Sequence, residues 1–146
     1  MEGKEVAVIG GGSWATAIVK MLCNNASMVH WWMRDESKAN YINKFMHNPR
    51  YLSSVQFERD KIRVSNDLSD IISSAETVVI ATPSAFLMDV FGDRDNSDLE
   101  NKTIISAVKG IVPEVHQIPA RFFHKRFGTP YEYIGIISGP CPVSYT

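Results

Sequence analysis

The chain has 146 residues, 45% of them apolar and 21% charged, which suffices for one globular domain spanning residues 1–146 but not for two. Its 15 basic and 16 acidic residues are interspersed and give a formal net charge of −1, which argues against a nucleic-acid or anionic-lipid surface. No apolar run approaches the roughly 20 residues that span a bilayer, and no apolar signal region precedes the first strand-like run. We therefore expect a cytoplasmic protein with no nucleic-acid partner and no stable membrane insertion.

Six short runs rich in β-branched or aromatic residues predict strands. Several of them are almost continuously apolar, which is typical of parallel strands that are covered on both faces. The runs are residues 5–9, 28–33, 61–65, 77–81, 103–108 and 133–137.

Helical patterns lie between the predicted strands. The first places an apolar stripe on one face of a helix that ends near Asn24 and Asn25; its members are Trp14, Ala17, Ile18, Met21 and Leu22. The second pattern covers residues 36–46, with four residues expected on its inner side: Ala39, Ile42, Phe45 and Met46.

Two further helices are indicated by their end signals. Asp67, followed by Asp70, fits a carboxylate cap that opens a short helix. Pro119 fits a first-turn position, and Gly128 fits a left-handed terminator of the same helix. The alternation of strand and helix predicts a Rossmann-type α/β fold, a doubly wound, mainly parallel sheet between helix layers. Residues 47–59 form a Pro-containing loop with aromatic anchors, and residues 92–102 are expected to form a solvated polar connector.

The most informative local motif is the turn that follows the first strand. Gly10, Gly12 and Ala15 fit the pattern G-x-G-x-x-G/A, between a predicted strand and an amphipathic helix. The first glycine permits a tight turn, the second permits close approach of a diphosphate, and Ala15 is small where helix and strand pack. Free N–H groups at the helix start favour an anion there. The turn therefore predicts dinucleotide binding, and the alternative is an ordinary flexible loop.

An acidic residue that binds the ribose hydroxyls is expected about 20 residues after such a turn. Arg34 stands at the end of the second strand instead, and a guanidinium can pair with the 2′-phosphate of NADP. Asp35, next to it, leaves the choice between NAD and NADP open. Arg34 as a solvated strand-end residue is the other interpretation.

Five motifs in this order resemble bacterial NAD(P)-dependent glycerol-3-phosphate dehydrogenase over almost the whole chain. They are GGGSWATA at residues 10–17, HNPRYL at 47–52, Thr82-Pro83-Ser84, Lys109-Gly110 and Ser138-Gly139-Pro140. The resemblance implies reduction of dihydroxyacetone phosphate to sn-glycerol 3-phosphate, a phospholipid precursor, with NAD or NADP as cofactor.

The resemblance also implies roles for single residues. Pro83, Ser84 and Phe86 match coenzyme-contacting positions, as do Ser13 and Trp14 beside the glycines. Core packing is the alternative for Phe86. Lys109 matches a lysine that reaches the substrate, where positive charge stabilises the carbonyl oxygen during hydride addition; an exposed lysine without a catalytic role is the alternative.

The resemblance also implies what these 146 residues lack. In the family an all-helical domain follows the Gly-Pro pair and carries the main catalytic lysine and the groups that hold the substrate phosphate. The final six residues, CPVSYT, depart from the small and acidic residues usual there, so we expect this chain to be the coenzyme-binding part, inactive alone.

Other classes of function find little support. The histidines and the two cysteines, Cys23 and Cys141, have no metal-ligand or disulfide spacing, so no metal is expected. Ser84 and Ser138 lack the G-x-S-x-G pattern of a hydrolase. Two alternatives stay open, a non-catalytic NAD(P)-binding or sensor module and a related two-domain hydroxyacid dehydrogenase. The sequence does not fix the oligomeric state, and a homodimer is compatible with it.

Overall fold

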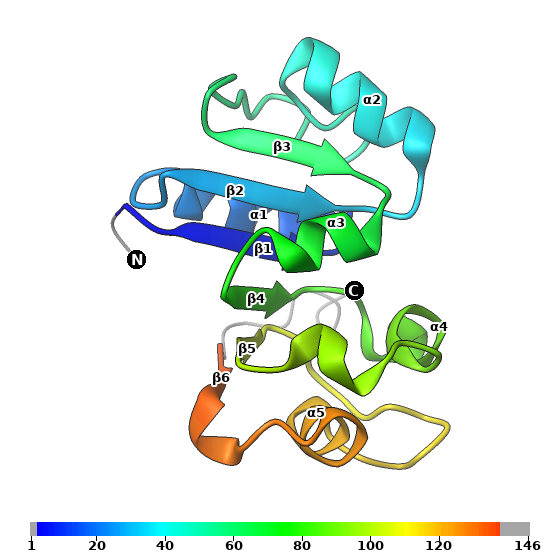
Figure 1. The fold of residues 1–146 in the computed structure, drawn as a ribbon. Coiled ribbons are helices and arrows are strands. Elements are labelled where there is room, and N and C mark those ends of the chain that lie inside the picture. Colours follow the sequence, from blue (N-terminus) through cyan, green and yellow to red (C-terminus); the bar gives the residue numbers. More distant parts are fainter. Residues whose placement is uncertain (1–2, 138–146) are drawn as a thin grey trace.

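The computed structural model describes residues 3–137, which form a six-stranded parallel sheet with helices on both faces (Figure 1). The strand order is β3-β2-β1-β4-β5-β6, and each neighbouring pair is parallel. The strands are β1 (Glu5–Ile9), β2 (Met28–Trp32), β3 (Ile62–Ser65), β4 (Thr77–Ile80), β5 (Thr103–Ser106) and β6 (Ile134–Ile136). This is the doubly wound order. Strands are added outward from β1 through β2 to β3, and the chain then returns to the other side of β1 and adds β4, β5 and β6 outward in the opposite direction. The predicted Rossmann-type fold is confirmed.

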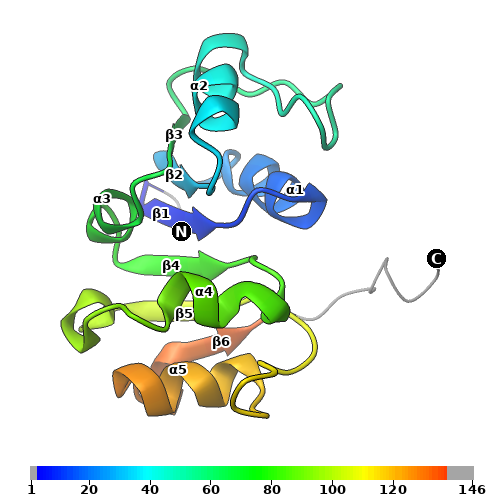
Figure 2. The same ribbon diagram turned by 90° about the vertical axis from the view of Figure 1, so that its right-hand side faces the viewer.

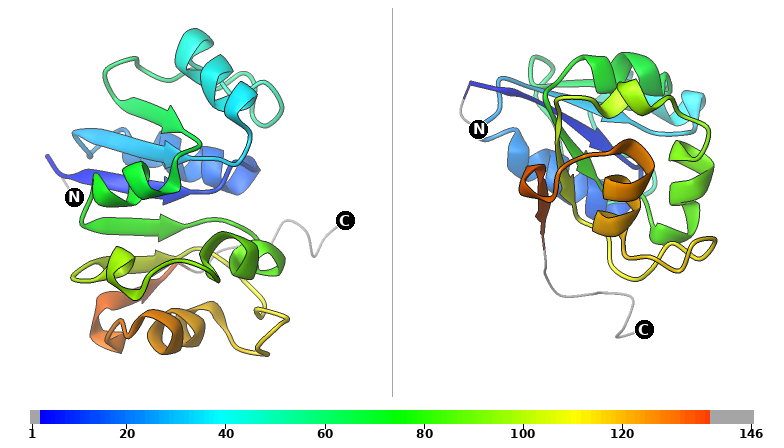
Figure 3. Two further views of the ribbon diagram at one scale, coloured as in Figure 1. Left: turned by 45° about the vertical axis from the view of Figure 1, so that its right-hand side comes forward. Right: turned by 60° about the horizontal axis from the view of Figure 1, so that its bottom comes forward.

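The helices divide between the two faces of the sheet. Helices α1 (Ser13–Leu22) and α2 (Glu36–Phe45) pack on one face, in a core with Val8, Trp31 and Val64. Helices α3 (Leu68–Ser73), α4 (Leu87–Phe91) and α5 (Pro119–Phe127) pack on the other face, in a core with Ile9 and Ile80. Figure 2 shows α1 and α3 on opposite sides of β1, and Figure 3 (left) shows α3 and α5 in front of the sheet with α1 behind it.

The six predicted strands are all present, but most end one or two residues earlier than the apolar runs suggested. The sixth run is shortened at both ends, and its start is displaced because Tyr131–Tyr133 form a 3₁₀ helix before β6 begins. The N–H of Tyr133 donates to the carbonyl of Pro130 at 2.9 Å, so the backbone there closes a turn instead of joining the sheet.

The helix ends that were predicted from capping residues, proline and glycine are confirmed. The Asp67 side chain accepts a hydrogen bond from the N–H of Asp70 at 3.1 Å and caps α3. Pro119 begins α5, and Gly128 ends it with φ of 72°. Asp35 likewise caps α2 by accepting from the N–H of Lys38 at 3.2 Å.

Three sequence expectations about burial are wrong. Trp14 and Met21 were expected on the inner stripe of α1 but are 36% and 55% exposed; Ile18 of that stripe is buried, as predicted, and the rest of the buried face is formed by Ala15, Thr16 and Val19. Phe45 was expected inside α2 but is 47% exposed and packs against Tyr41 on the outer surface, with ring centroids 4.6 Å apart.

The third concerns residues 92–102, which are not a purely solvated connector. They contain the 3₁₀ helix Asn96–Leu99, whose Leu99 is buried. Arg126 of α5 donates to the Gly92 and Arg94 carbonyls and holds the segment against the domain. Helix α5 therefore fixes a segment whose composition alone suggested free surface.

No helix within residues 3–137 is long and apolar enough to cross a membrane. Among the same residues, no cluster of three or more His, Cys, Asp or Glu side chains is arranged to hold a metal ion.

Candidate functional site

In the turn after β1, Gly10 and Gly12 occupy backbone positions with different steric requirements. Gly10 has φ of 139°, and a Cβ added there would lie 2.8 Å from the carbonyl oxygen of Ala81, so the fold itself requires glycine. Gly12 has φ of −85° and ψ of −169°, an extended conformation open to any residue, and a Cβ there would meet nothing within 4 Å. The space beside Gly12 is therefore left open by the fold, which fits the close approach of a diphosphate.

Four successive carbonyl groups in this turn, from Ile9 to Gly12, each accept a hydrogen bond from a side chain. The donors come from four separate segments of the chain. They are Thr82 Oγ1 to Ile9 (3.1 Å), Trp31 Nε1 to Gly10 (2.6 Å), Asn48 Nδ2 to Gly11 (3.4 Å) and Thr16 Oγ1 to Gly12 (2.7 Å). The backbone of the turn is therefore held in one conformation on its carbonyl side.

Helix α1 begins directly after this turn, with Gly12 as its N-cap and the exposed Ser13 as its first residue. The first N–H groups of a helix have no intrahelical acceptor, and the helix dipole places about half a positive charge there. Ala15 is fully buried against the sheet, as a close helix–strand contact requires. The candidate residues Gly10, Gly12, Ser13 and Ala15 thus lie in one turn whose geometry suits an anion.

Arg34 lies at the carboxyl end of β2 and is exposed to solvent. Its neighbour Asp35 is the N-cap of α2, and its carboxylate accepts a hydrogen bond from the N–H of Lys38. This structural role argues against Asp35 as the acid that binds the ribose hydroxyls. Lys38 adds a second cation here, with Nζ 4.0 Å from the position of a Cβ on Gly11 and 5.2 Å from the ring centre of Tyr51. Lys38 therefore lies beside the turn, and Arg34 follows the neighbouring end of β2.

The loops after β4 and β5 lie next to each other at the same edge of the sheet. Pro83 is exposed and Ser84 begins the 3₁₀ helix Ser84–Phe86. Phe86 is 48% exposed, so the core-packing interpretation of this residue is wrong. Gly110 has φ of 90°, and a Cβ there would lie 3.2 Å from Ser84 Oγ, which shows how closely the two loops approach.

Trp14 and Lys109 complete this edge. Trp14 is 36% exposed, and its Nε1 donates to the carbonyl of Ala107 at 2.9 Å, two residues before Lys109. Lys109 itself is exposed. The structure therefore brings the sequence-predicted residues from the ends of β1, β2, β4 and β5 to one edge, while Ser138-Gly139-Pro140 lies outside the described residues.

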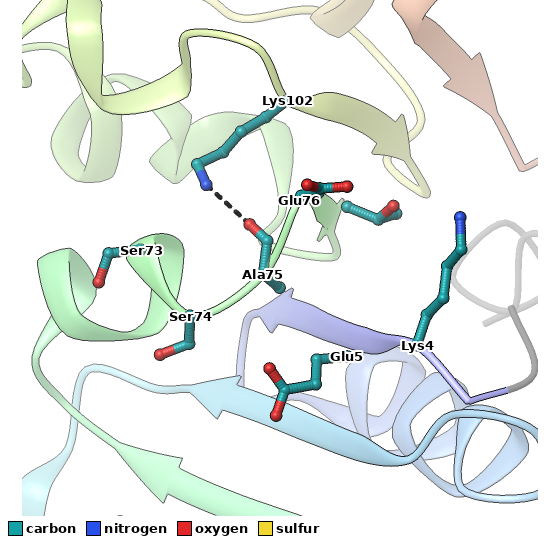
Figure 4. A pocket seen from close by; sticks show the side chains of 8 residues that line it. Lys4, Glu5, Ser73, Ser74, Ala75, Glu76 and Lys102 are labelled. Carbon is teal, nitrogen blue, oxygen red and sulfur yellow. Dashed lines mark hydrogen bonds between the residues drawn. The ribbon is translucent and has the colours of Figure 1, made fainter.

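A hollow of about 360 Å³ lies at the opposite edge, where β1 and β4 begin (Figure 4). Its walls carry both signs of charge, from Lys4, Glu5, Glu76 and Lys102. Burial lowers the pKa of Lys102, against the opposing effect of Glu76, and Lys102 Nζ donates to the Ala75 carbonyl at 2.7 Å. Ligands of doubly wound sheets bind at the carboxyl ends of the strands, so we do not place the coenzyme here.

The comparisons with known proteins agree with this geometry. The family model described as "NAD-dependent glycerol-3-phosphate dehydrogenase N-terminus" matches residues 5–142. This chain belongs to that family. The expected cofactor class, NAD or NADP, is thereby confirmed at the level of the family.

The dehydrogenase relatives are longer than this chain. It is 33% identical over 135 residues to glycerol-3-phosphate dehydrogenase [NAD(P)+] of Pseudomonas syringae pv. syringae, covering 92% of this chain and 38% of that protein. It is 32% identical over 139 residues to the same enzyme of Pseudomonas putida F1, covering 95% and 40%. A Plasmodium falciparum glycerol-3-phosphate dehydrogenase structure shares the fold, with a TM-score of 0.81 and 23% identity over 94% of this chain and 41% of that one. The chain thus spans about two fifths of these dehydrogenases.

Three residues of this dehydrogenase-family site were not singled out from the sequence. Trp31 lies within a predicted strand and was given no role at the site, yet its indole donates to the Gly10 carbonyl. Asn48 and Tyr51 lay within HNPRYL, whose presence in the resemblance was the available signal. A contact between residues 11 and 48 leaves no local pattern, so only the fold could reveal it.

Proposed function

We propose that this chain is the coenzyme-binding part of a glycerol-3-phosphate dehydrogenase that reduces dihydroxyacetone phosphate to sn-glycerol 3-phosphate with NADH or NADPH. The observation that carries the proposal is the tethered turn at Gly12, open to a ligand and located where the sheet reverses between β1 and β4. Membership of an NAD(P)-dependent family supports a dinucleotide as the ligand of that turn. Supply of the phospholipid backbone is the expected role, and the cytoplasm the expected compartment.

The coenzyme would lie along the carboxyl edge of the sheet. Its diphosphate would meet the N–H groups of Gly12 and Ser13, where the helix dipole favours negative charge. The adenosine ribose would lie on the β2 side, where Arg34 can pair with the 2′-phosphate of NADPH. The nicotinamide half would lie on the other side, against Pro83, Ser84 and Phe86.

The nicotinamide ring supplies the hydride when the coenzyme is bound. Lys109 follows β5, beside the Ser84 loop, and would place a positive charge near the carbonyl oxygen of the substrate. Such a preorganised charge stabilises the oxygen as it becomes negative, so Lys109 is the catalytic candidate within this chain. Trp14 would support that loop through Ala107.

Because the relatives extend well beyond the matched region, we propose that the remaining substrate-binding and catalytic groups belong to that extension. The 146 residues should then bind coenzyme but turn over poorly. A small-molecule substrate is the expected partner, and a homodimer stays a prediction.

The test is to titrate the 146-residue chain with NADH and NADPH by calorimetry, following tryptophan emission in parallel. We expect binding with a Kd in the micromolar to millimolar range and dihydroxyacetone phosphate reduction near background. Absence of binding to both nucleotides would overturn the proposal. Robust turnover by the 146 residues alone would refute the need for further groups.

A second arm separates the enzyme from the alternatives. A chain extended to the length of its relatives is assayed with dihydroxyacetone phosphate and with 2-hydroxy acid substrates. Reduction of dihydroxyacetone phosphate supports the proposal. Preference for hydroxyacids, or coenzyme binding without any turnover, would point to the related dehydrogenase or to the sensor module.

A further inference from the structure

Asn48 is the least expected contributor to the turn, because it lies in the irregular segment between α2 and β3 and yet is fully buried. Its Nδ2 donates to Thr16 Oγ1 at 3.0 Å and to the Gly11 carbonyl at 3.4 Å. Its Oδ1 accepts from the N–H groups of Arg50 at 3.0 Å and Tyr51 at 3.2 Å. All the donors and acceptors of the carboxamide are therefore used.

The partners of Asn48 also fix the orientation of its carboxamide. Backbone N–H groups can donate only to Oδ1, and the Gly11 carbonyl can accept only from Nδ2. The residue thus joins two segments in a defined way, with its oxygen on the 47–51 loop and its nitrogen on the Gly11–Thr16 turn. Loss of the side chain would leave the Gly11 carbonyl without this tether, although the other three carbonyls of the turn would keep theirs.

The tether matters for a ligand because of peptide geometry. In a trans peptide the C=O and the N–H of the same unit point in opposite directions. A Gly11 carbonyl directed toward Asn48 therefore directs the Gly12 N–H away from it. In the same way, the Gly12 carbonyl accepts from Thr16 Oγ1 at 2.7 Å, which directs the Ser13 N–H outward. Asn48 contacts both Gly11 and Thr16, so it acts on both peptide units.

We propose that Asn48 is a positioning residue for the coenzyme diphosphate. It does not contact the ligand; it holds the Gly11–Gly12 peptide so that the Gly12 N–H is directed to the phosphate before binding. Preorganised donors bind more tightly than donors that must first be ordered. This inference rests on the proposed coenzyme binding.

Asn43 provides a matched control. It also spans two elements with both ends of its carboxamide, since Nδ2 donates to the Val64 carbonyl at 2.7 Å and Oδ1 accepts from the Val64 N–H at 3.1 Å. Both of these side-chain bonds join α2 to β3 and not to the turn. Asn43→Ala should therefore reproduce the loss of a bridging carboxamide without changing the diphosphate donors.

The experiment measures NADH and NADPH binding by calorimetry for the wild-type chain, Asn48→Ala and Asn43→Ala, each at the same temperature interval below its own Tm. We expect Asn48→Ala to raise both Kd values tenfold or more, and Asn43→Ala to change them less than twofold. Amide NMR adds a local readout, because NADH should shift the Gly12 and Ser13 resonances in the wild type and in Asn43→Ala but only weakly in Asn48→Ala.

A second pair of variants covers the case in which Asn48→Ala does not fold. Asn48→Asp keeps the acceptor for Arg50 and Tyr51 but removes the donors to the turn, and Asn43→Asp makes the same chemical change at the control position. Equal Kd values for the Asn48 and Asn43 variants, with wild-type binding intact, would overturn the inference and leave the proposed function standing. A wild-type chain that binds neither nucleotide would overturn both.

Discussion

Trp14 Nε1 donates to the carbonyl oxygen of Ala107 over 2.9 Å, and the two residues are separated by 93 positions in the sequence. This bond joins the first turn of α1 to the loop that follows β5. Because that loop leads to Lys109, the segment proposed to hold the diphosphate and the segment proposed to reach the substrate are mechanically connected. The proposed site is therefore one unit in which binding of the coenzyme and placement of Lys109 depend on the same contacts.

Replacing Trp14 with Phe tests this connection. The ring is retained, but the hydrogen bond to Ala107 is lost, and a partly buried bond of this kind contributes about 1 kcal/mol to stability. We expect Trp14→Phe to lower the free energy of unfolding by about that amount in urea titrations followed by circular dichroism. An unchanged free energy would mean that the bond does not stabilise the fold.

Replacement by alanine should affect a different property at each of the two positions, the stability of the fold at Gly10 and the binding of the coenzyme at Gly12. Gly10→Ala introduces a Cβ at φ of 139° and 2.8 Å from the Ala81 carbonyl, so it should cost about 3 kcal/mol or more, or prevent folding.

Gly12→Ala introduces a Cβ into open space and should leave Tm nearly unchanged. Its coenzyme Kd should nevertheless rise roughly tenfold, about 1.4 kcal/mol, because the methyl group occupies the approach of the diphosphate. Thermal unfolding and calorimetry on both variants decide the matter. If Gly12→Ala binds the coenzyme as tightly as the wild type, the diphosphate does not bind beside Gly12.

The sequence predicted the strands, their parallel arrangement and the glycine turn between β1 and α1, because these depend on local patterns. It predicted the helix faces less well. Helix α1 is apolar on most sides, so a stripe from Ile18 toward Trp14 and Met21 and a stripe from Ile18 toward Ala15 and Val19 have equally good spacing. The fold decides between them, because Ala15 must lie against the sheet where helix and strand approach closely, and Met21 is then directed to solvent.

Contacts between segments that are distant in the chain could not be predicted from the sequence. The indole of Trp31 could be predicted as buried, but its bond to Gly10 depends on the pairing of β1 with β2. Asn48 is a polar residue in a loop, and its complete burial follows only from the approach of that loop to α1. In both cases a side-chain donor reaches a backbone carbonyl more than 20 residues away, and no local pattern encodes that distance.

Coenzyme preference should depend on the charge at residue 34. A guanidinium paired with a 2′-phosphate contributes about 1.5–3 kcal/mol, so Arg34→Glu should weaken NADPH binding by roughly 10- to 100-fold. NADH lacks the phosphate and should lose much less. Arg34→Gln separates loss of attraction from added repulsion and should give an intermediate change. Equal losses for both coenzymes would remove Arg34 from the selectivity.

His30 should make the stability of the domain depend on pH. It is only 7% exposed, and Nδ1 accepts from Arg63 Nε at 3.0 Å, which places the proton of the neutral ring on Nε2, 3.5 Å from Glu5 Oε1. Burial, and then the charge of Arg63, lower the pKa of His30, against the opposing effects of Glu5 and Asp70. The folded state therefore resists protonation of this ring.

The unfolded state binds the proton first as the pH falls, since its histidine titrates near about 6.5. The stability linked to His30 is thus fully present above that pH and is lost progressively below it. We expect the free energy of unfolding to fall between about pH 7 and pH 5, and to fall less in His30→Asn. The exposed His116 provides the control, because His116→Asn should follow the wild-type curve in urea titrations across the same range. Parallel curves for the wild type and His30→Asn would show that this imidazole is not linked to folding, and the acid sensitivity would then have to be sought in the carboxylates around Arg63.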